Sequence, residues 1–499
     1  MDSQIRLPIQ IIATVACVIV LAIIQLGAAD AFELTSRQPW MDEIHTLELV
    51  SDPDTSHMLD ALADGADFNP PGYYLIARTI TQWAGSSEPK VLRTLSLMCV
   101  IAGLTAIGLS LQRYARFSVA IAVVAGLWCQ TLLVDQSLEA RFYAPWFTAL
   151  AWLCFFFEKE RQSFVTTTAS CLLAIAVCCI HYFGVISVAL VVGGLLARRP
   201  RSIRNPSLWL PLCCGLVALG MCYPFYAGQR SALTVATWIS PPNFARIERF
   251  AWKLIPGAVI GIAFVAAVAN RVFAGNDTNT APTETDDKST AGRFNLPNYS
   301  GSLALLLMPI VLLVFSFVVQ PALVPRYSLV FFIGCAPVLA WLLEKVRIQL
   351  LVPVALSFLV LGTIRTSGLR EQLVQLDQSR LQMMDMINKH AWGQPVAFEN
   401  RIDSFPLMRL AGDDSPNWYL VDFETDALAK PSALRIVQRD VARRFVKWYP
   451  KYRMAPLPEL RIRERFFVVP YADGTTADID YGPFESRQVA DRLYELQRF

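Results

Sequence analysis

Charged residues are scarce in this chain. Lys, Arg, Asp and Glu make up 17% of the 499 residues, whereas hydrophobic residues make up 54%. This balance excludes an ordinary soluble protein of this length and indicates an integral membrane protein. The formal net charge is +3, and so small an excess gives no indication of a nucleic-acid partner. The positions of the charges therefore carry more information than their sum.

Residues that build thiolate or imidazole metal centres are also sparse. The four histidines (His45, His57, His181 and His390) are scattered, and all 11 cysteines fall inside apolar runs. No Cys and His spacing resembles a zinc site, so the cysteines are interpreted as small buried hydrophobic residues. The chain also lacks a G-x-G-x-x-G segment after a strand and a P-loop. No nucleotide cofactor is therefore predicted.

Long apolar runs are abundant. The first, at 8–29, is long enough to cross ~30 Å of hydrocarbon and is interpreted as a retained anchor, because acidic residues and no cleavage site follow it. Further apolar segments lie at 91–111, 117–134, 142–157, 163–180, 184–197, 207–226, 250–273, 301–320, 328–344 and 349–364. Each should form a helix, since lipid offers the backbone no hydrogen-bond partners. The predicted fold class is mainly α, a polytopic transmembrane helical bundle of about eleven spans.

Basic residues in the short loops predict the orientation of the bundle. If the N-terminus is cytoplasmic, the inner loops carry Arg113, Arg116, Lys159, Arg161, Arg198, Arg199, Arg201, Arg204, Lys345 and Arg347. The acidic loop at 30–90 then lies outside. An odd number of spans places the C-terminal region outside as well. We therefore expect a multi-pass protein of the cytoplasmic membrane with an extracytoplasmic C-terminal domain.

Two domains are predicted. Residues 1–364 form the transmembrane region, interrupted at 275–298 by a Thr- and Asp-rich stretch that is expected to be a disordered cytoplasmic linker. Residues 365–499 have the composition of a small soluble α/β domain. In that domain an amphipathic helix pattern at 368–390 precedes strand-like runs at 395–400, 418–423 and 465–471, and a closing helix is expected at 485–499.

The large outer loop carries two adjacent carboxylates, Asp42 and Glu43, shortly after the anchor. Carboxylates at a membrane surface suit a general base, or a Mg²⁺ or Mn²⁺ ion that screens a phosphate. The alternative for this pair alone is a solvated acidic loop. A turn with paired prolines follows at 69–74, and its Tyr73 and Tyr74 suit the membrane interface.

The order of these features resembles a known family. The anchor, the W-x-D-E loop, the P-P-G-Y-Y turn and the span that starts near 88–93 resemble the multi-pass glycosyltransferases of the GT-C fold. The most similar group contains protein O-mannosyltransferases, aminoarabinose transferases and the Rgt-like lipopolysaccharide sugar transferases. The resemblance covers the first 200 residues well and the later spans in layout. It implies transfer of a sugar from a polyprenyl-phosphate donor to an acceptor on the outer membrane face.

The resemblance also implies roles for particular residues. Asp42 would be the catalytic base or a metal contact, with Glu43 beside it. The implied substrate-binding residues of the outer loops are Tyr73, Tyr74, Glu139, Arg141, Tyr143, His181, Tyr182, Arg326 and Tyr327. For His181 a packed or hydrogen-bonded polar side chain is favoured over a ligand.

A charge argument that does not use the resemblance supports a phosphate ligand. Several cations on the predicted outer face oppose the positive-inside tendency, namely Arg141, Arg230, Arg246, Arg249, Lys253 and Arg326. A guanidinium group binds phosphate oxygens as a bidentate fork and stabilises a departing phosphate. The alternative is that these side chains extend to the interface or pair with carboxylates.

The predicted reaction is a single in-line displacement that inverts the anomeric carbon. The main alternative is a transporter or flippase for a lipid-linked or small polar substrate, which would be expected to carry ionisable residues or broken helices at mid-membrane. A non-catalytic scaffold for cell-envelope assembly is a third possibility, but it leaves the acidic loop unexplained.

Overall fold

The computed structural model describes residues 3–159, 162–231, 241–275, 296–412, 417–424, 433–470 and 479–499, together with Ile239 and Leu428. Most of the predicted linker at 275–298 lies outside the described residues. The chain forms two compact units. The first contains Met1–Thr35, Arg93–Met221 and Pro242–Arg370, and the second contains Ser36–Leu92, Cys222–Pro241 and Glu371–Phe499.

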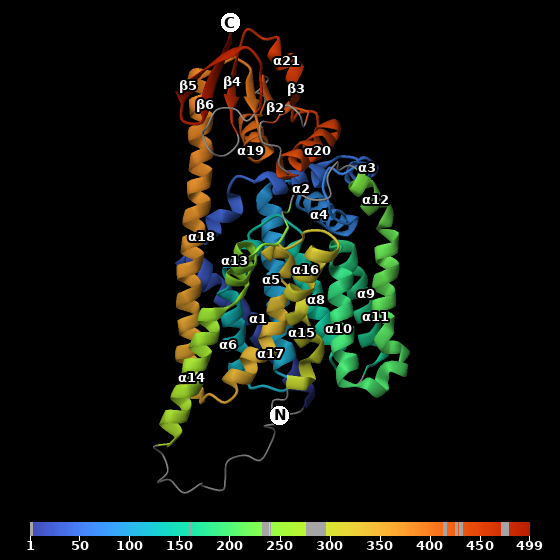
Figure 1. The fold of residues 1–499 in the computed structure, drawn as a ribbon. Helices are drawn as coiled ribbons and strands as arrows, with labels where there is room; N and C mark the ends of the chain where they lie inside the picture. The colour runs from blue at the N-terminus through green and yellow to red at the C-terminus, as the bar shows by residue number, and fades with distance from the viewer. Residues whose placement is uncertain are drawn as a thin grey trace, which may run out of the picture. The chain divides into compact units, whose positions relative to one another are not determined.

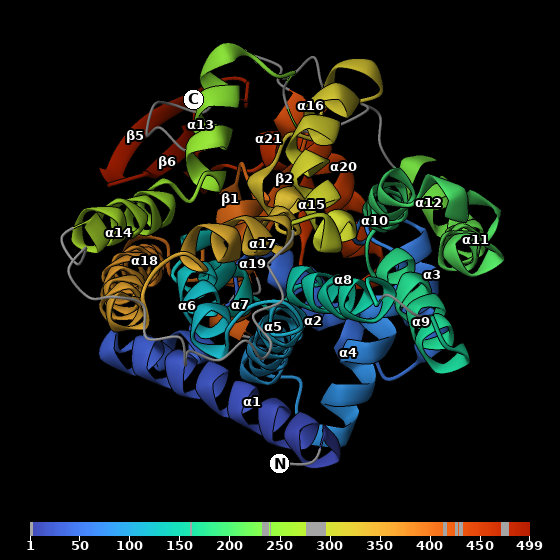
Figure 2. The same cartoon turned by 90° about the horizontal axis from the view of Figure 1, so that it is seen from below.

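The first unit is a helical bundle (Figures 1 and 2). Its helices are α1 (Ser3–Ala28), α5 (Pro89–Leu111), α6 (Phe117–Trp128), α7 (Thr131–Ser137), α8 (Tyr143–Phe157), α9 (Phe164–Ile180), α10 (Gly184–Arg198), α11 (Pro206–Met221), α13 (Phe244–Leu254), α14 (Gly257–Gly275), α15 (Ser300–Ala304), α16 (Met308–Val318), α17 (Phe331–Leu343) and the first half of α18 (Ile348–His390). Short 3₁₀ segments are η1 (Ala31–Ser36), η2 (Pro200–Arg204), η3 (Leu296–Tyr299), η4 (Leu305–Leu307) and η5 (Pro325–Ser328).

The helices match the predicted spans one by one. Four helices or helix runs are long and apolar enough to cross a membrane, at Pro8–Ala28, Pro89–Leu111, Leu296–Val318 and within Ile348–His390. Three bent pairs, α6 with α7, α11 with α12 and α13 with α14, pass the same test together, and α8, α9, α10 and α17 are shorter apolar helices. Within the described residues, these helices confirm a polytopic helical bundle, and their number is roughly consistent with the predicted eleven spans.

The surface of the bundle is apolar where lipid would contact it. Side chains such as Ile12, Val217, Phe264, Val318 and Val360 are all more than half exposed. In water such a surface would associate with other apolar surfaces, whereas in a bilayer it is matched by the acyl chains. The apolar exterior and the helix lengths therefore both indicate that the bundle lies in a membrane.

Small residues set the spacing inside the bundle. A side chain at Gly194 of α10 would place its Cβ 2.1 Å from the carbonyl oxygen of Ser300 in α15. These two helices therefore pack closely because glycine occupies the contact, as is common between helices in membranes.

The second unit combines helices with a sheet. Its helices are α2 (Met41–Ser51), α3 (Thr55–Ala63), α4 (Pro71–Ala84), α12 (Tyr223–Ser231), α19 (Arg401–Ala411), α20 (Ala433–Trp448), α21 (Leu457–Arg461) and the second half of α18. Its strands are β1 (Val396–Phe398), β2 (Trp418–Asp422), β3 (Met454–Pro456), β4 (Arg465–Val469), β5 (Phe484–Ala490) and β6 (Leu493–Arg498).

The six strands form one mixed sheet in the order β3-β2-β1-β4-β6-β5. The first four are parallel, with Val396 opposite Trp418 on one side and opposite Phe467 on the other. Helices connect the parallel strands, as parallel pairing requires. The predicted strand-like runs at 395–400, 418–423 and 465–471 are confirmed as β1, β2 and β4.

The predicted closing helix at 485–499 is wrong. These residues form most of the antiparallel hairpin β5–β6, which turns at Asp491 and Arg492, and β6 pairs with β4 from Arg465 to Val468. Arg492 has φ +53°, a left-handed conformation that interrupts any helix there. Pairing with β4 and burial of Leu493 and Leu496 therefore override the helical preference of the sequence.

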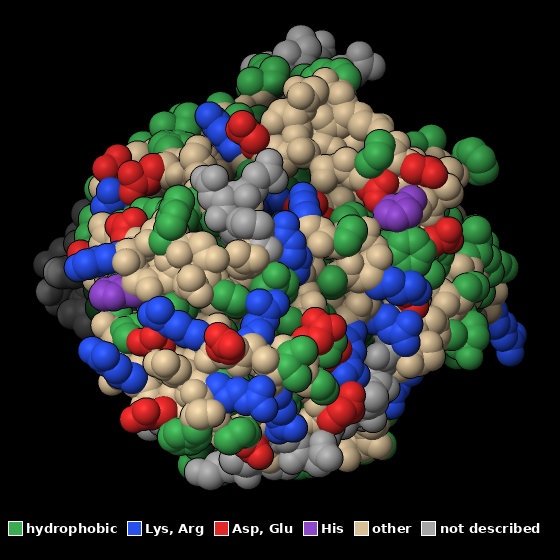
Figure 3. Space-filling view, turned by 90° about the horizontal axis from the view of Figure 1, so that it is seen from above, with side chains coloured by type: hydrophobic (Ala, Val, Ile, Leu, Met, Phe, Trp, Pro, Cys, Tyr) green, Lys and Arg blue, Asp and Glu red, His purple; other side chains and the backbone are tan. Residues whose placement is uncertain are grey.

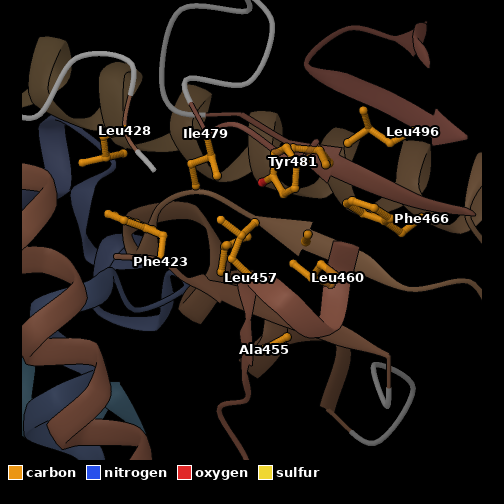
Figure 4. Close-up of a cluster of buried hydrophobic side chains, with 12 residues drawn as sticks. Phe423, Leu428, Ala455, Leu457, Leu460, Phe466, Ile479, Tyr481 and Leu496 are labelled. Carbon is orange, nitrogen blue, oxygen red and sulfur yellow. The ribbon is translucent and has the colours of Figure 1, made fainter. Parts of the chain in front are cut away.

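An apolar core holds the sheet against α21 and the adjoining loops. Leu457, Leu460, Phe466, Tyr481 and Leu496 converge in Figure 4, and each is at most 5% exposed. On the face seen in Figure 3, Lys and Arg side chains alternate with Asp and Glu. Pairs such as Arg443 with Asp422 at 2.6 Å show that many cations of this unit are neutralised locally.

Candidate functional site

The first unit gathers aromatic and arginine side chains from three chain segments that lie far apart in the sequence. The segments are the break between α7 and α8, the turn between α9 and α10, and η5. We call the group the aromatic–arginine cluster; its members are Arg141, Phe142, Tyr143, Trp146, His181, Phe183, Arg326 and Tyr327. Five of its members were predicted from the sequence, namely Arg141, Tyr143, His181, Arg326 and Tyr327.

The ring of His181 lies at the centre of the cluster. Its centroid is 4.5 Å from the stacked ring of Trp146, 5.4 Å from Tyr327 and 6.1 Å from Tyr143. Its Nδ1 accepts a hydrogen bond from the backbone N–H of Phe183 at 3.0 Å, so the neutral ring carries its proton on Nε2. His181 is therefore both packed and hydrogen-bonded.

Local backbone geometry fixes this ring. His181 ends α9 in an extended conformation, with φ −146° and ψ 135°. Gly184 then starts α10, and a Cβ there would lie 2.3 Å from the carbonyl oxygen of Val177. Glycine is therefore required for the tight turn that presents His181.

The two arginines of the cluster contact aromatic faces. The guanidinium carbon of Arg326 lies 5.5 Å from the ring centroid of Tyr143, and that of Arg141 lies 5.0 Å from the centroid of Phe142. Both guanidinium groups also lie close enough to His181 to interact with its ring electrostatically. Arg141 is 4% exposed, and in such surroundings electrostatic attraction for an anion is stronger than in water.

Two further predicted residues of this unit flank the cluster. Glu139 is buried, and its backbone carbonyl accepts a hydrogen bond from the Ser96 hydroxyl at 2.6 Å. Tyr182 is partly exposed beside His181 in the same turn. Glu139 therefore anchors the segment before Arg141 to α5 through its main chain.

Sequence reasoning missed Trp146, Phe142 and Phe183. Each lies inside or beside an apolar run, where an aromatic residue is expected as core. A usable signal was the position of Trp146 one helical turn after Phe142, because residues four apart share a helix face. That face of α8 is the one turned toward His181.

The predicted carboxylates belong to the second unit. Asp42 and Glu43 lie in the first turn of α2, where acidic residues favour the positive end of the helix dipole. Their surroundings differ because neighbouring residues on a helix point in different directions. Glu43 is fully buried and accepts a hydrogen bond from the backbone N–H of Trp40 at 3.2 Å, with Arg37 at 3.9 Å. Asp42 is partly exposed.

The predicted tyrosines at the start of α4 are buried. Their rings meet edge to face at 5.5 Å, and the Tyr74 hydroxyl donates to Asp67 at 2.7 Å. Asp67 also accepts from the backbone N–H of Phe68 at 2.7 Å. This network fixes the loop between α3 and α4. The substrate-binding role predicted for Tyr73 and Tyr74 stays a prediction.

His45 lies one turn along α2 from Asp42. Its Nδ1 lies 2.7 Å from the Ala66 carbonyl oxygen and its Nε2 lies 3.4 Å from an Arg401 nitrogen. Burial lowers the pKa of His45 to about 4, and the positive charge of Arg401 acts in the same direction. The imidazole is therefore neutral at pH 7, with Nδ1 donating to Ala66 and Nε2 accepting from Arg401.

Carboxylates of the loop at 30–90 pair with C-terminal residues within this unit. Glu48 contacts Arg409 at 2.6 Å, Lys451 at 2.7 Å and the Tyr452 hydroxyl at 2.8 Å. These contacts join α2 to α19 and to the segment after α20.

Asp64 makes a second set of such contacts, with Arg444 at 2.9 Å, Lys447 at 2.6 Å and the Trp448 indole at 2.8 Å. Partial burial works to raise the pKa of Asp64, but the hydrogen bonds from Lys447 and Trp448 and the nearby charges outweigh it, so the pKa lies below its usual range. Asp64 is therefore ionised at neutral pH and joins the end of α3 to α20.

The prediction of a divalent metal on Asp42 and Glu43 meets an unfavourable arrangement. The Glu43 carboxylate already accepts a hydrogen bond from the Trp40 N–H and lies 3.9 Å from Arg37. Within the described ranges, no three His, Cys, Asp or Glu side chains group as a metal would require. The divalent metal on Asp42 and Glu43 therefore stays a prediction.

Comparisons with known proteins give a fold. No family model and no curated protein matches the sequence. Among solved structures, the chain is similar to ArnT from Cupriavidus metallidurans bound to undecaprenyl phosphate, with a TM-score of 0.57 and 10% identity over 97% of both chains. The apo structure of the same protein gives a TM-score of 0.49, 12% identity and coverage of 97% of this chain and 98% of the other.

The first of these similarities extends over nearly the whole chain and includes the C-terminal sheet as well as the bundle. It agrees with the apolar helices of the first unit. The protein is therefore a multi-pass membrane protein with the GT-C fold of ArnT.

Proposed function

We propose that this protein is an inverting glycosyltransferase. It moves a sugar from a polyprenyl-phosphate carrier to an acceptor hydroxyl on the outer face of the cytoplasmic membrane. The observation that carries the proposal is the aromatic–arginine cluster, which brings Arg141 and Arg326 to one buried imidazole. The fold adds support, because the ArnT structure that shares it holds undecaprenyl phosphate.

The arginines suit the phosphate of the donor. Each guanidinium group offers a planar fork that matches two phosphate oxygens, and burial strengthens the attraction. The aromatic rings around His181 exclude water and leave the Nε2–H as a further donor. Charge that develops on the departing phosphate would therefore meet donors already in place, which is the usual source of a large rate gain.

Asp42 is assigned the role of general base. It is the more exposed of the two carboxylates, whereas Glu43 is committed to the start of α2. In the proposed step, Asp42 removes the proton of the acceptor hydroxyl as its oxygen attacks the anomeric carbon. The bond between that carbon and the phosphate oxygen breaks, and polyprenyl phosphate leaves with the electron pair. One displacement inverts the anomeric configuration.

The test uses the purified full chain in proteoliposomes with undecaprenyl phosphate-linked hexoses and pentoses as donors and a membrane glycolipid extract as the acceptor mixture. The readout is release of undecaprenyl phosphate, which does not depend on knowing the acceptor. Asp42→Asn should reduce release by about 10²–10⁴-fold. Arg326→Ala should reduce it by about 10²–10³-fold.

Matched control substitutions distinguish the loss of a catalytic group from a general loss of folded protein. Asp60→Asn on the exposed side of α3 and Arg204→Lys in η2 should release product at the wild-type rate. Wild-type activity in Asp42→Asn would exclude that residue as the base. Movement of the intact donor across the bilayer without release would instead establish the transporter or flippase alternative.

A further inference from the structure

An apolar groove lies on the bundle surface between α14 and α18, which run side by side in Figures 1 and 2. Its volume is about 540 Å³, within the ~300–1,000 Å³ typical of small-molecule sites. The lining comes from small or apolar side chains, including Ala258, Gly261 and Ala266 of α14 and Leu350, Pro353 and Val354 of α18. The groove therefore fits a hydrocarbon chain and offers little to a polar solute.

Small residues keep the groove open. A Cβ at Gly261 would meet no atom within 4 Å. Pro353 and Ser357 are exposed on the facing helix, and the Ser357 hydroxyl donates to the Pro353 carbonyl at 2.9 Å. The one polar side chain of the lining is thus satisfied within α18, which leaves the groove apolar toward its occupant.

Cations gather at one end of the groove. Arg271, Lys345 and Arg347 are exposed there. Asn270 links the helix ends, since its side chain donates to the Lys345 carbonyl at 2.7 Å and accepts from the Arg347 backbone N–H at 3.0 Å. Leu350 lies only three residues beyond Arg347, about 4.5 Å along the helix. The apolar lining therefore begins within one helical turn of the cations.

An aromatic residue marks the same end. The ammonium group of Lys345 lies 4.7 Å from the ring centroid of Trp341. Tryptophan beside lysine is typical of the lipid headgroup level. The loops at this end carry the basic residues that predict the cytoplasmic side, where the leaflet is rich in anionic lipids.

We propose that this groove binds an anionic phospholipid of the cytoplasmic leaflet. One acyl chain would lie between α14 and α18, and the phosphate would sit among Arg271, Lys345 and Arg347. The charge complementarity favours an anionic headgroup over a zwitterionic one, by about fivefold for each cation. This lipid is distinct from the polyprenyl donor of the proposed reaction, and the proposal does not depend on that reaction.

The experiment is native mass spectrometry of the purified full chain titrated with dioleoyl phosphatidylglycerol or dioleoyl phosphatidylcholine, which carry the same acyl chains. Wild type should retain phosphatidylglycerol at least fivefold more than phosphatidylcholine. The triple variant Arg271→Ala, Lys345→Ala, Arg347→Ala should lose this preference. Its control, Arg201→Ala with Arg204→Ala, removes two exposed cations of η2 and should keep it.

A second variant tests the groove itself. Gly261→Leu places a side chain in open space and should lower phosphatidylglycerol retention without lowering the unfolding midpoint. Gly193→Leu in α10, where a Cβ also meets no atom within 4 Å, is the matched control and should retain the lipid. Equal retention of both lipids by wild type, or a preference unchanged in the triple variant, would overturn the proposal. So would displacement of phosphatidylglycerol by undecaprenyl phosphate, since the groove would then take the donor lipid.

Discussion

Two neighbouring carboxylates in the first turn of α2 differ in their exposure to solvent. Glu43 is fully buried against the backbone of Trp40, with Arg37 nearby, while Asp42 keeps contact with solvent. A buried carboxylate that satisfies a helix start contributes to stability, and a partly exposed one remains able to exchange a proton. The two residues should therefore separate in mutagenesis.

We expect Glu43→Ala to lower the free energy of unfolding by about 1–3 kcal/mol, because the Trp40 N–H loses its acceptor and a buried carboxylate is replaced by a methyl group. Asp42→Asn should leave the unfolding midpoint unchanged while reducing undecaprenyl phosphate release by about 10²–10⁴-fold. Thermal unfolding followed by intrinsic fluorescence measures both variants. An equal loss of midpoint in the two would show that Asp42 is structural as well.

The second residue-scale prediction concerns pH. The pKa of folded His45 is about 4, against 6.5 for an ordinary histidine. Between these values the unfolded state binds more protons than the folded state, so the free energy of unfolding falls as the pH drops from 6.5 toward 4. The contribution is complete above pH 6.5 and amounts to about 3 kcal/mol at most.

His45→Gln removes this titration while its amide can still donate to the Ala66 carbonyl and accept from Arg401. Unfolding midpoints measured from pH 4.5 to 7.5 should therefore depend less on pH in the variant. His390→Gln, at the exposed end of α18, is the control and should keep the wild-type slope. Parallel curves for wild type and His45→Gln would contradict the assignment.

Individual site residues could be predicted where charge or position made them unusual. Arg141 and Arg326 were identifiable because cations on the predicted outer face oppose the positive-inside tendency. Trp146 and Phe183 could not be, since an aromatic residue in an apolar run has the same pattern whether it packs in the core or lines a site. Glu43 was assigned with Asp42 because a sequence does not show which of two adjacent carboxylates turns inward.

At the scale of elements, the apolar spans were predictable because membrane helices have a minimum length and a uniform composition. The final hairpin was not. Residues 485–499 are rich in helix-forming side chains, yet β6 pairs with β4, which lies about thirty residues earlier. A partner strand at that separation leaves no mark on the local sequence, so tertiary pairing decided the outcome.

Substitutions at Arg492 distinguish hairpin from helix. Its φ of +53° is tolerated by asparagine and costly for a β-branched residue. Arg492→Val should therefore be less stable than Arg492→Asn by about 1–2 kcal/mol. Both variants lose the Asp403 ion pair, so that loss cancels. Urea unfolding gives the comparison, and equal stability would favour a helix, in which valine and asparagine have similar propensities.

At the scale of the whole molecule, the loop at 36–92 and the C-terminal region belong to one compact unit. Glu48 pairs with Arg409 and Lys451, and Asp64 pairs with residues at the end of α20. Without the C-terminal residues, the buried carboxylate of Glu48 would lose Arg409, Lys451 and Tyr452 as partners.

Deletion of Glu371–Phe499 should therefore unfold the loop at 36–92 while the bundle helices remain protected. Limited proteolysis followed by mass spectrometry reads out both regions in one sample. New cleavage is expected within α2 and α3, and none in α8 to α10. Cleavage patterns that match the full chain in both regions would show that the loop folds without its C-terminal partners.

The pairing of Glu48 with Tyr452 also has a temporal consequence. The two residues are 404 positions apart, which at ribosomal rates of ~5–20 residues per second corresponds to roughly 20–80 s of synthesis. During that interval the nascent loop has been made but its partners have not. Biogenesis of this protein therefore includes an obligatory waiting period, in which α2 and its acidic side chains are open to chaperones and to proteases.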